Sequence, residues 1–398
     1  MEMFEVIVVG AGPAGSSAAR DASLAGLSTL LLEKQKLPRE KRCGGGISAA
    51  ALKELDFTLP DRIVERRCYG MWGIQNSILT EVRVDRCVAT MVSRSTFDAF
   101  LVEKAVEAGA RIAEAEACRE IRVLPDCVIV LTEKAEYRAA LVIGADGVSS
   151  LVARSVRPKW KRREMRFCLV ADVPLSPESI YQKMRDLVEL RYGFIRRGYA
   201  WAFPKRDHVS FGIGGTVGDA RALRLDFARY LKLHGIDSEV PCKGCFIPVS
   251  EFRHDVVADR LMLCGDAAGF VDCFNGEGIR YAIASGRLAG RAAALAFKKG
   301  DFSKRTLFAY QRAFYARHKK DLVWSSFIMG LSSRLPRLVF GPLLADRKTI
   351  LRYFKVMSGD EHFRSFARWI IVRLPWLIVR HFLVPGSSIG HVNTRPKR

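Results

Sequence analysis

Three glycines near the amino terminus have the spacing of a loop that binds a dinucleotide. Gly10, Gly12 and Gly15 form the pattern G-x-G-x-x-G between an apolar segment and a run of small residues. The first glycine permits a tight turn, the second lets backbone approach a pyrophosphate, and the third lets a helix pack closely on a strand. Glu33 follows where a carboxylate can bind ribose hydroxyls. We therefore predict a dinucleotide site, with the pyrophosphate at the helix amino terminus.

Two aspartates farther along the chain follow short apolar segments. The segment LVIGADG ends in Asp146-Gly147, and LMLCGD ends in Asp266 before two alanines that predict the start of a helix. At such strand-to-helix turns a carboxylate can bind the ribityl chain of a flavin, and it can equally cap a helix. The aspartates alone leave both roles open.

The elements that must position these residues predict an α/β fold in three parts. Residues 4–33 read as strand, glycine turn, helix and strand, and alternating apolar patterns elsewhere predict antiparallel strands. The expected parts are a Rossmann-like dinucleotide-binding domain (1–65, 95–160 and 255–300), an antiparallel-sheet substrate domain (66–94 and 165–254) and a helical C-terminal region (301–398).

Together with the aspartates and their order, four more segments resemble the geranylgeranyl reductases of the p-hydroxybenzoate hydroxylase superfamily. They are KRCGGGIS from Lys41, VSRSTFDAFL from Val92, GYAWAFPK from Gly198 and DCFNGEGIRYAIASG from Asp272. The resemblance covers roughly residues 4–300 and implies FAD in the glycine loop. It also implies an isoprenoid lipid substrate and an electron donor, either NAD(P)H or ferredoxin.

The resemblance assigns site residues by position. Those expected at the cofactor are Gly10, Gly12, Ala14, Gly15, Glu33, Cys43, Gly44, Arg94, Asp146, Asp266, Gly276, Gly278 and Ile279. Those expected at the substrate are Tyr199, Trp201, Phe203 and Pro204. Cys43 is the expected catalytic residue, and no metal is expected.

The residue types of two of these segments allow two interpretations each. Tyr199, Trp201 and Phe203 alternate with alanines, so on a strand they share one face. That face can pack on the core or line a pocket for a long apolar chain. Cys43 follows the Lys41-Arg42 pair, and nearby cations favour a thiolate. Cys43 is thus either a proton donor near the flavin or an inert loop cysteine.

A second cysteine pattern is the C-x-x-C of Cys242 and Cys245. Zinc would need two further ligands at suitable spacing, and none is evident. A turn that holds two thiols is the favoured interpretation, with a redox pair as the alternative.

Composition and charge restrict the partners. The 398 residues carry 64 Lys and Arg against 42 Asp and Glu, a net charge of +22, which attracts anionic partners. From Arg334 to Arg398, basic residues alternate with large apolar ones, including Trp369 and Trp376. This pattern predicts a helix that lies on an anionic membrane, or a terminal cap that packs on the core. We expect a cytoplasmic protein, peripheral on the cytoplasmic face of the membrane, that does not bind nucleic acid.

The expected activity is saturation of C=C bonds in geranylgeranyl chains. An archaeal-type membrane lipid best explains so basic a protein, and a chlorophyll side chain or a menaquinone tail remains an alternative substrate. Two flavin enzyme classes are alternatives: a monooxygenase or halogenase of the same superfamily, and a quinone oxidoreductase. The latter would need an iron–sulfur module, yet no cysteine follows Cys273. A third alternative is a basic protein that binds membrane or nucleic acid and has a vestigial flavin fold.

Overall fold

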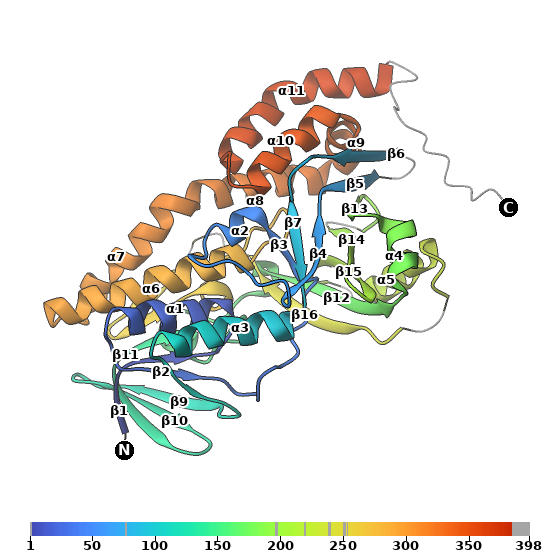
Figure 1. Cartoon of the computed structure of the whole chain (residues 1–398). Helices are drawn as coiled ribbons and strands as arrows, with labels where there is room; N and C mark the ends of the chain where they lie inside the picture. Colours follow the sequence, from blue (N-terminus) through green and yellow to red (C-terminus); the bar gives the residue numbers. More distant parts are fainter. Residues whose placement is uncertain are drawn as a thin grey trace.

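The structure is a computed structural model of the whole chain (Figure 1). It describes residues 2–75, 78–195, 198–218, 220–237, 240–249, 252 and 254–383. The last part of the expected basic tail, residues 384–398, therefore lies outside the described residues.

An eight-stranded sheet carries the amino-terminal glycine loop. Its main path runs β17-β18-β11-β1-β2-β8, and β10 and β9 extend it from β11. Strands β1, β2, β8, β11 and β18 pair in parallel, as expected for a Rossmann-like domain. The strands are β1 (Glu2–Val9), β2 (Thr29–Leu32), β8 (Arg111–Ala113), β9 (Cys118–Val123), β10 (Val128–Thr132), β11 (Glu136–Gly144), β17 (Val257–Ala258) and β18 (Leu261–Leu263).

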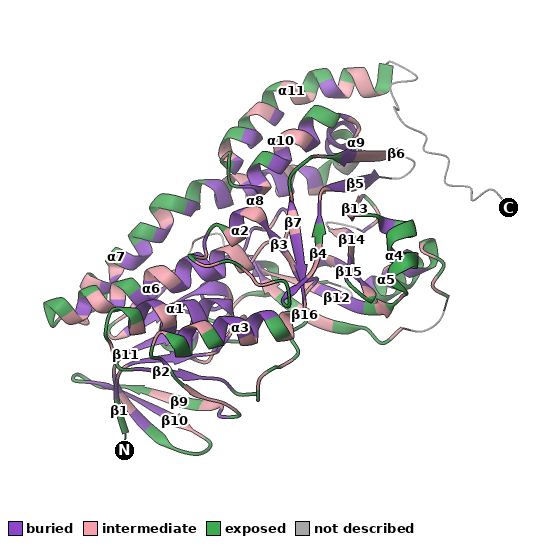
Figure 2. Cartoon of the chain, viewed as in Figure 1, coloured by how far each residue is buried: buried purple, intermediate pink, exposed green. Residues whose placement is uncertain are grey.

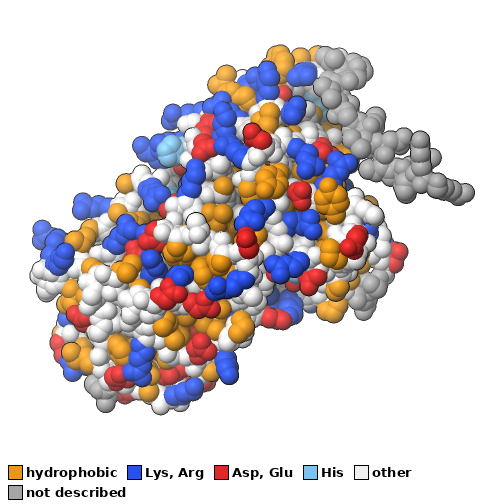
Figure 3. All heavy atoms as spheres, in the orientation of Figure 1, with side chains coloured by type: hydrophobic (Ala, Val, Ile, Leu, Met, Phe, Trp, Pro, Cys, Tyr) orange, Lys and Arg blue, Asp and Glu red, His pale blue; other side chains and the backbone are white. Residues whose placement is uncertain are grey.

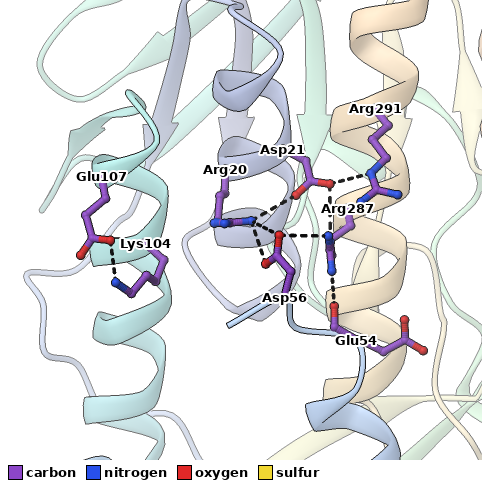
Figure 4. Close-up of polar contacts among 8 residues, drawn as sticks. All are labelled: Arg20, Asp21, Glu54, Asp56, Lys104, Glu107, Arg287 and Arg291. Carbon is purple, nitrogen blue, oxygen red and sulfur yellow. Dashed lines mark hydrogen bonds and ion pairs between the residues drawn. The ribbon is translucent and has the colours of Figure 1, made fainter. Parts of the chain in front are cut away.

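Three helices pack together beside this sheet, and α1 (Pro13–Leu24) lies between α3 (Arg94–Glu107) and α6 (Ile279–Lys299) (Figure 4). Ion pairs join α1 to α6 at their solvent edge. Asp21 contacts Arg287 at 3.5 Å and Arg291 at 2.8 Å. Asp21 is almost fully buried, so these pairs are screened less than exposed ones. They hold the glycine-loop helix against the helix that follows the 272–278 loop.

A seven-stranded sheet forms the second layer, in the order β16-β12-β15-β14-β13-β5-β6. The expectation of antiparallel strands was wrong at one pair, because β13 runs parallel to β5. The two strands lie far apart in sequence, so no turn chemistry could signal this pairing. The strands are β5 (Gly70–Gln75), β6 (Ile78–Arg83), β12 (Met165–Pro174), β13 (Leu187–Tyr192), β14 (Tyr199–Pro204), β15 (His208–Thr216) and β16 (Lys243–Pro248).

Helices α4 (Pro177–Met184) and α5 (Ala220–Leu233) cover one face of this sheet, where Ala200 and Ala202 join a buried cluster with Phe227. A small sheet, in the order β3-β7-β4, lies between the two larger ones (Figure 1). Its strands are β3 (Gly46–Ser48), β7 (Ala89–Val92) and β4 (Val64–Cys68), and the short helix α2 (Ala49–Leu52) follows β3.

The C-terminal region is helical, as expected. Helices α8 to α11 surround a separate buried cluster that includes Phe340, Phe363 and Phe366. In Figure 2 their inner faces are purple and their outer faces green or pink. The helices are α7 (Lys304–Phe314), α8 (Lys320–Arg334), α9 (Pro336–Ala345), α10 (Arg347–Met357) and α11 (Phe363–Leu383).

Candidate functional site

The glycine loop lies at the carboxyl end of β1, and α1 begins at Pro13 with Gly12 as its N-cap. Gly10 has φ +101°, a backbone conformation that only glycine adopts readily. A methyl group on Gly12 would have one neighbour within 4 Å, the Arg39 guanidinium at 3.8 Å. Gly12 therefore faces open space, whereas a methyl group on Gly15 would lie 1.8 Å from the Gly10 carbonyl oxygen.

Glu33 lies beside this loop at the end of β2. Its carboxylate accepts a hydrogen bond from the Ala11 N–H at 3.1 Å and pairs with Arg39 at 3.0 Å. The side chain is buried, with 3% exposed. A carboxylate held here by a backbone donor and a cation is placed for the hydroxyls of a nucleotide ribose.

The two aspartates occupy different surroundings. Asp146 accepts hydrogen bonds from the Leu151 and Val152 N–H groups at 2.6 and 3.3 Å, where the 3₁₀ turn Val152–Ser155 begins. Burial raises the pKa of Asp146. Asp266 lies in the 3₁₀ turn Gly265–Ala267 that follows β18. The sequence predicted a longer helix at this point.

Two residues assigned to the site lie chiefly in packing contacts. Ala14 is buried in α1, where a methyl group on Gly265 would lie 2.9 Å from its Cβ. Pro204 ends β14, is buried and pairs with Val209 of β15. Ala14 and Pro204 therefore contribute packing contacts, and neither offers a polar side-chain group to a ligand.

The aromatic residues of β14 share one face of the seven-stranded sheet, as the alternation predicted. Ring centroids of Tyr199 and Trp201 are 5.8 Å apart, and those of Trp201 and Phe203 are 6.2 Å apart. The Trp201 indole lies across β15, where a methyl group on Gly212 would fall 2.1 Å from the ring. Only a glycine at 212 leaves room for this ring.

Trp201 carries an unsatisfied donor. Its side chain is 7% exposed, and within the described part of the chain its indole N–H has no hydrogen-bond partner. A methyl group on Gly44 would lie 2.7 Å from that nitrogen. A buried donor without a partner costs about 1–3 kcal/mol, so this N–H is suited to a ligand acceptor at the 43–45 loop.

Cys43 opens that loop, and its surroundings differ from those predicted. The prediction placed the Lys41-Arg42 pair beside its sulfur. Arg42 instead donates to the Gly244 carbonyl at 2.6 Å, and the cation hydrogen-bonded to Cys43 is Arg94. Arg94 also forms two hydrogen bonds to Asp98, at 2.8 and 2.9 Å. The cation beside the Cys43 sulfur is thus the Arg94 guanidinium of α3 and not that of its sequence neighbour Arg42, because the extended loop places Arg42 against β16.

Lys205 is a functional candidate that the sequence analysis did not select. It is 3% exposed and donates from Nζ to the Val92 carbonyl at 2.5 Å and toward that of Gly45 at 3.5 Å. Burial lowers the pKa of Lys205 to about 8. The signal was present in the sequence, because residue 205 continues the alternation of 199, 201 and 203.

The loop before α6 meets the same aromatic row. Tyr199 donates from its hydroxyl to the Asn275 carbonyl at 2.5 Å. Gly276 follows with φ +70°, and a methyl group on Gly278 would lie 3.5 Å from a carboxylate oxygen of Asp266. Ile279 is the first residue of α6. The structure therefore brings the 43–45, 199–205 and 275–279 segments to one seam between the two large sheets.

These residues fit FAD. The open space at Gly12, beside the α1 amino terminus, suits a pyrophosphate, and the Trp201 N–H at the seam is a donor without a partner. The glycine-loop end and the 275–279 loop at the seam are connected through α1 and α6, which pack together. The arrangement defines an FAD-dependent oxidoreductase.

Comparisons with known proteins agree with this class and narrow it. Residues 3–179 match the family model described as "FAD binding domain". The digeranylgeranylglycerophospholipid reductase 1 of Methanothermobacter thermautotrophicus is 31% identical over 77% of this chain and 81% of its own. The enzyme of that name from Methanopyrus kandleri is 32% identical over 77% and 85%. The chain belongs to the geranylgeranyl reductase family.

Solved structures share the fold. A geranylgeranyl bacteriochlorophyll reductase-like protein from Thermoplasma acidophilum has a TM-score of 0.80 at 23% identity, covering 94% of this chain and 99% of its own. The halogenase PltM has a TM-score of 0.68 at 16% identity, covering 92% and 86%. At these identities the likeness concerns the fold alone.

Proposed function

We propose that this protein saturates C=C bonds in geranylgeranyl chains borne by a membrane lipid of the digeranylgeranylglycerophospholipid type. The observation that carries the proposal is the aromatic row Tyr199, Trp201 and Phe203, which faces the 43–45 loop across the seam. Such a wall offers a long alkene many apolar contacts and few polar ones, as a prenyl chain requires. The relatives' names point to the same substrate class.

FAD, when bound and reduced, supplies hydride transfer. The chain's residues have the remaining tasks. Trp201 and Phe203 orient the prenyl chain of the substrate and exclude water. Tyr199 connects the aromatic row to the 275–279 loop through its hydrogen bond to the Asn275 carbonyl. An isolated alkene must also receive a proton at its second carbon. Cys43 and Lys205 bear protons at the seam, as does the Tyr199 hydroxyl, and Lys205 holds the loop of Cys43 through the Gly45 carbonyl.

The test is a single-turnover reaction. Holoprotein is reduced with dithionite under argon and mixed with digeranylgeranylglycerophospholipid, and the lipid is then analysed by mass spectrometry. We expect products heavier by two mass units for each bond reduced. An unreduced sample is the control. Unchanged lipid after full reoxidation of the flavin would refute the proposal, and a halide-dependent product from an aromatic substrate would favour the halogenase alternative.

We further propose that the protein docks on anionic bilayers through the outer face of α11. Side chains on that face are exposed although they are apolar. They are Ile371, Val372, Trp376, Val379, Phe382 and Leu383, of which Val372 is 80% exposed. A contiguous exposed apolar surface of this kind is typical of an interaction site.

Cations flank this stripe. The guanidiniums of Arg373 and Arg380 lie 5.2 and 5.3 Å from the ring centre of Trp376. Figure 3 shows blue Lys and Arg side chains among orange apolar ones over this end of the molecule. A basic, Trp-bearing helix with an exposed apolar face suits the interface of an anionic bilayer. Within the described residues no helix is long and apolar enough to cross a membrane.

Vesicle sedimentation tests the docking proposal. Wild-type protein should bind vesicles with anionic lipid more strongly than zwitterionic ones, and less strongly at high salt. Val372→Glu should weaken binding to both. The matched control is Leu24→Glu, which changes an equally apolar exposed residue (59% exposed) at the end of α1. Equal binding of the two variants would contradict the assignment of α11.

A further inference from the structure

Two cysteines of the seven-stranded sheet, Cys168 and Cys245, form a pair that cannot be seen in the C-x-x-C pattern. Cys168 of β12 and Cys245 of β16 are directly opposite each other in the antiparallel register. Both side chains lie on the face that carries Trp201, and Cys168 is buried beside that ring. The residue that faces Cys245 is therefore Cys168, 77 positions away in the sequence, and Cys242 precedes the strand.

The register gives the two cysteines the Cα spacing that a disulfide requires. Opposite residues in an antiparallel pair have Cα atoms about 4.5 or 5.5 Å apart. Disulfide-bonded cysteines have Cα atoms about 4.4–6.8 Å apart, so either ladder position is compatible. Cys242 and Cys245 are separated by three extended residue steps, about 10 Å. That separation lies outside the range, and Cys242 cannot replace Cys168.

The two thiols are chemically unequal. The Cys168 thiol is hydrogen-bonded to the Cys245 sulfur, which raises the pKa of Cys168 well above its usual value, and burial adds to the rise. The same hydrogen bond lowers the pKa of Cys245, and the positive charges of Lys41 and Arg42 lower it further. Cys245 is only half-buried. It is thus the accessible and more nucleophilic member of the pair.

We propose that Cys168 and Cys245 are a peroxide-sensitive dithiol that closes to a cross-strand disulfide in the wall of the site. The Cys245 sulfur attacks one oxygen of hydrogen peroxide and the O–O bond breaks. Cys245 becomes a sulfenic acid, and one water is released. The Cys168 sulfur then attacks that sulfur and displaces a second water. Two thiols and one peroxide give one disulfide and two waters, and a dithiol reductant reverses the change.

Formation of the disulfide should slow turnover because the segment before Cys43 contacts β16. That strand is the edge of its sheet, and Arg42 and Glu40 of the segment before Cys43 bind it through Gly244 and Lys243. Bond formation brings the two sulfurs to about 2.05 Å, which draws the edge strand inward. The displacement passes to the 43–45 loop that faces Trp201. This regulatory part of the inference rests on the proposed function, whereas the disulfide itself does not.

The experiment uses holoprotein that is first reduced, desalted and then treated with hydrogen peroxide. Free thiols are alkylated, and peptides are mapped by mass spectrometry. We expect a crosslink between the Cys168 and Cys245 peptides, with two free thiols lost per chain, reversed by dithiothreitol. Cys242→Ser should keep the crosslink. Cys168→Ser and, independently, Cys245→Ser should abolish it.

Turnover, measured on each protein before and after peroxide, tests the consequence. The wild-type and Cys242→Ser rates should fall several-fold and recover with dithiothreitol, whereas the rates of the two pair variants should not change reversibly. Absence of a crosslink, or one between Cys242 and Cys245 or involving Cys43, would overturn the proposed pair. A complete Cys168–Cys245 crosslink with undiminished turnover would overturn the regulatory part. If no reduced sample, the wild type included, turned over the lipid, that result would instead contradict the proposed function.

Discussion

Replacement of Gly12 by valine should abolish FAD binding while leaving the fold intact. The added side chain would project from a position whose hypothetical methyl group has one neighbour within 4 Å. Valine is a poorer N-cap than glycine, so the apoprotein should lose about 0.5–1 kcal/mol of stability and stay folded. The same side chain would fill the space that a pyrophosphate needs beside the α1 amino terminus. We therefore expect a folded, colourless protein.

Gly15→Ala is the matched control. Its methyl group would lie 1.8 Å from the Gly10 carbonyl oxygen, and backbone cannot yield as a flexible side chain does. Overpacking of this kind costs about 1–3 kcal/mol, occasionally more. Gly15→Ala should therefore destabilise the apoprotein more than Gly12→Val does.

Thermal unfolding with and without added FAD distinguishes the two effects. At a free FAD concentration 100 times its Kd, wild-type protein should gain about 2.7 kcal/mol of stability. Gly12→Val should gain none, and it should elute without flavin absorbance. Stoichiometric flavin in Gly12→Val would refute the placement of the pyrophosphate. An apoprotein as unstable as Gly15→Ala would show that Gly12 is needed for packing instead.

Three further outcomes are expected. Turnover should fall as pH rises through about 8, where Lys205 loses its proton. Lys205→Arg, whose guanidinium stays charged, should remove that fall. The same pH dependence of turnover in this variant and in the wild type would contradict the role of Lys205. Trp201→Ala should reduce turnover more than FAD content, whereas a loss of about 3–5 kcal/mol of stability with unchanged specific activity would indicate a packing role. Burial lowers the pKa of His318 to about 3, so between pH 6.5 and 3 the unfolded chain binds a proton that the folded chain does not. Stability should thus be about 2 kcal/mol lower at pH 5 than above pH 6.5, and urea unfolding of His318→Leu should lack this dependence.

The sequence predicted those parts of the site that depend on local pattern. The glycine loop and the shared face of Tyr199, Trp201 and Phe203 follow from spacing along one segment, and the structure has both. The same period-two pattern extends to Lys205, so that residue could have been found. Its burial could not, because burial depends on the Val92 and Gly45 carbonyls that other segments supply.

What the sequence could not predict is register between distant strands. The C-x-x-C pattern was interpreted as a turn that holds two thiols, with a Cys242–Cys245 redox pair as the alternative, since only chain proximity was visible. Strand pairing assigns Cys245 to Cys168 instead. The parallel pairing of β13 with β5 was missed for the same reason. A shift of one residue in either ladder would turn the side chains to the opposite face.

The seam between the two large sheets is held by contacts that alternate along β14 and its continuation. Tyr199 binds the Asn275 carbonyl, Trp201 lies against Gly44, and Lys205 binds the Val92 carbonyl and approaches that of Gly45. Each contact joins the β14 segment to a segment outside the seven-stranded sheet. Because one extended segment makes all of them, a displacement of the sheet moves every contact together. The aromatic row of β14 and the 43–45 loop are therefore positioned as one unit.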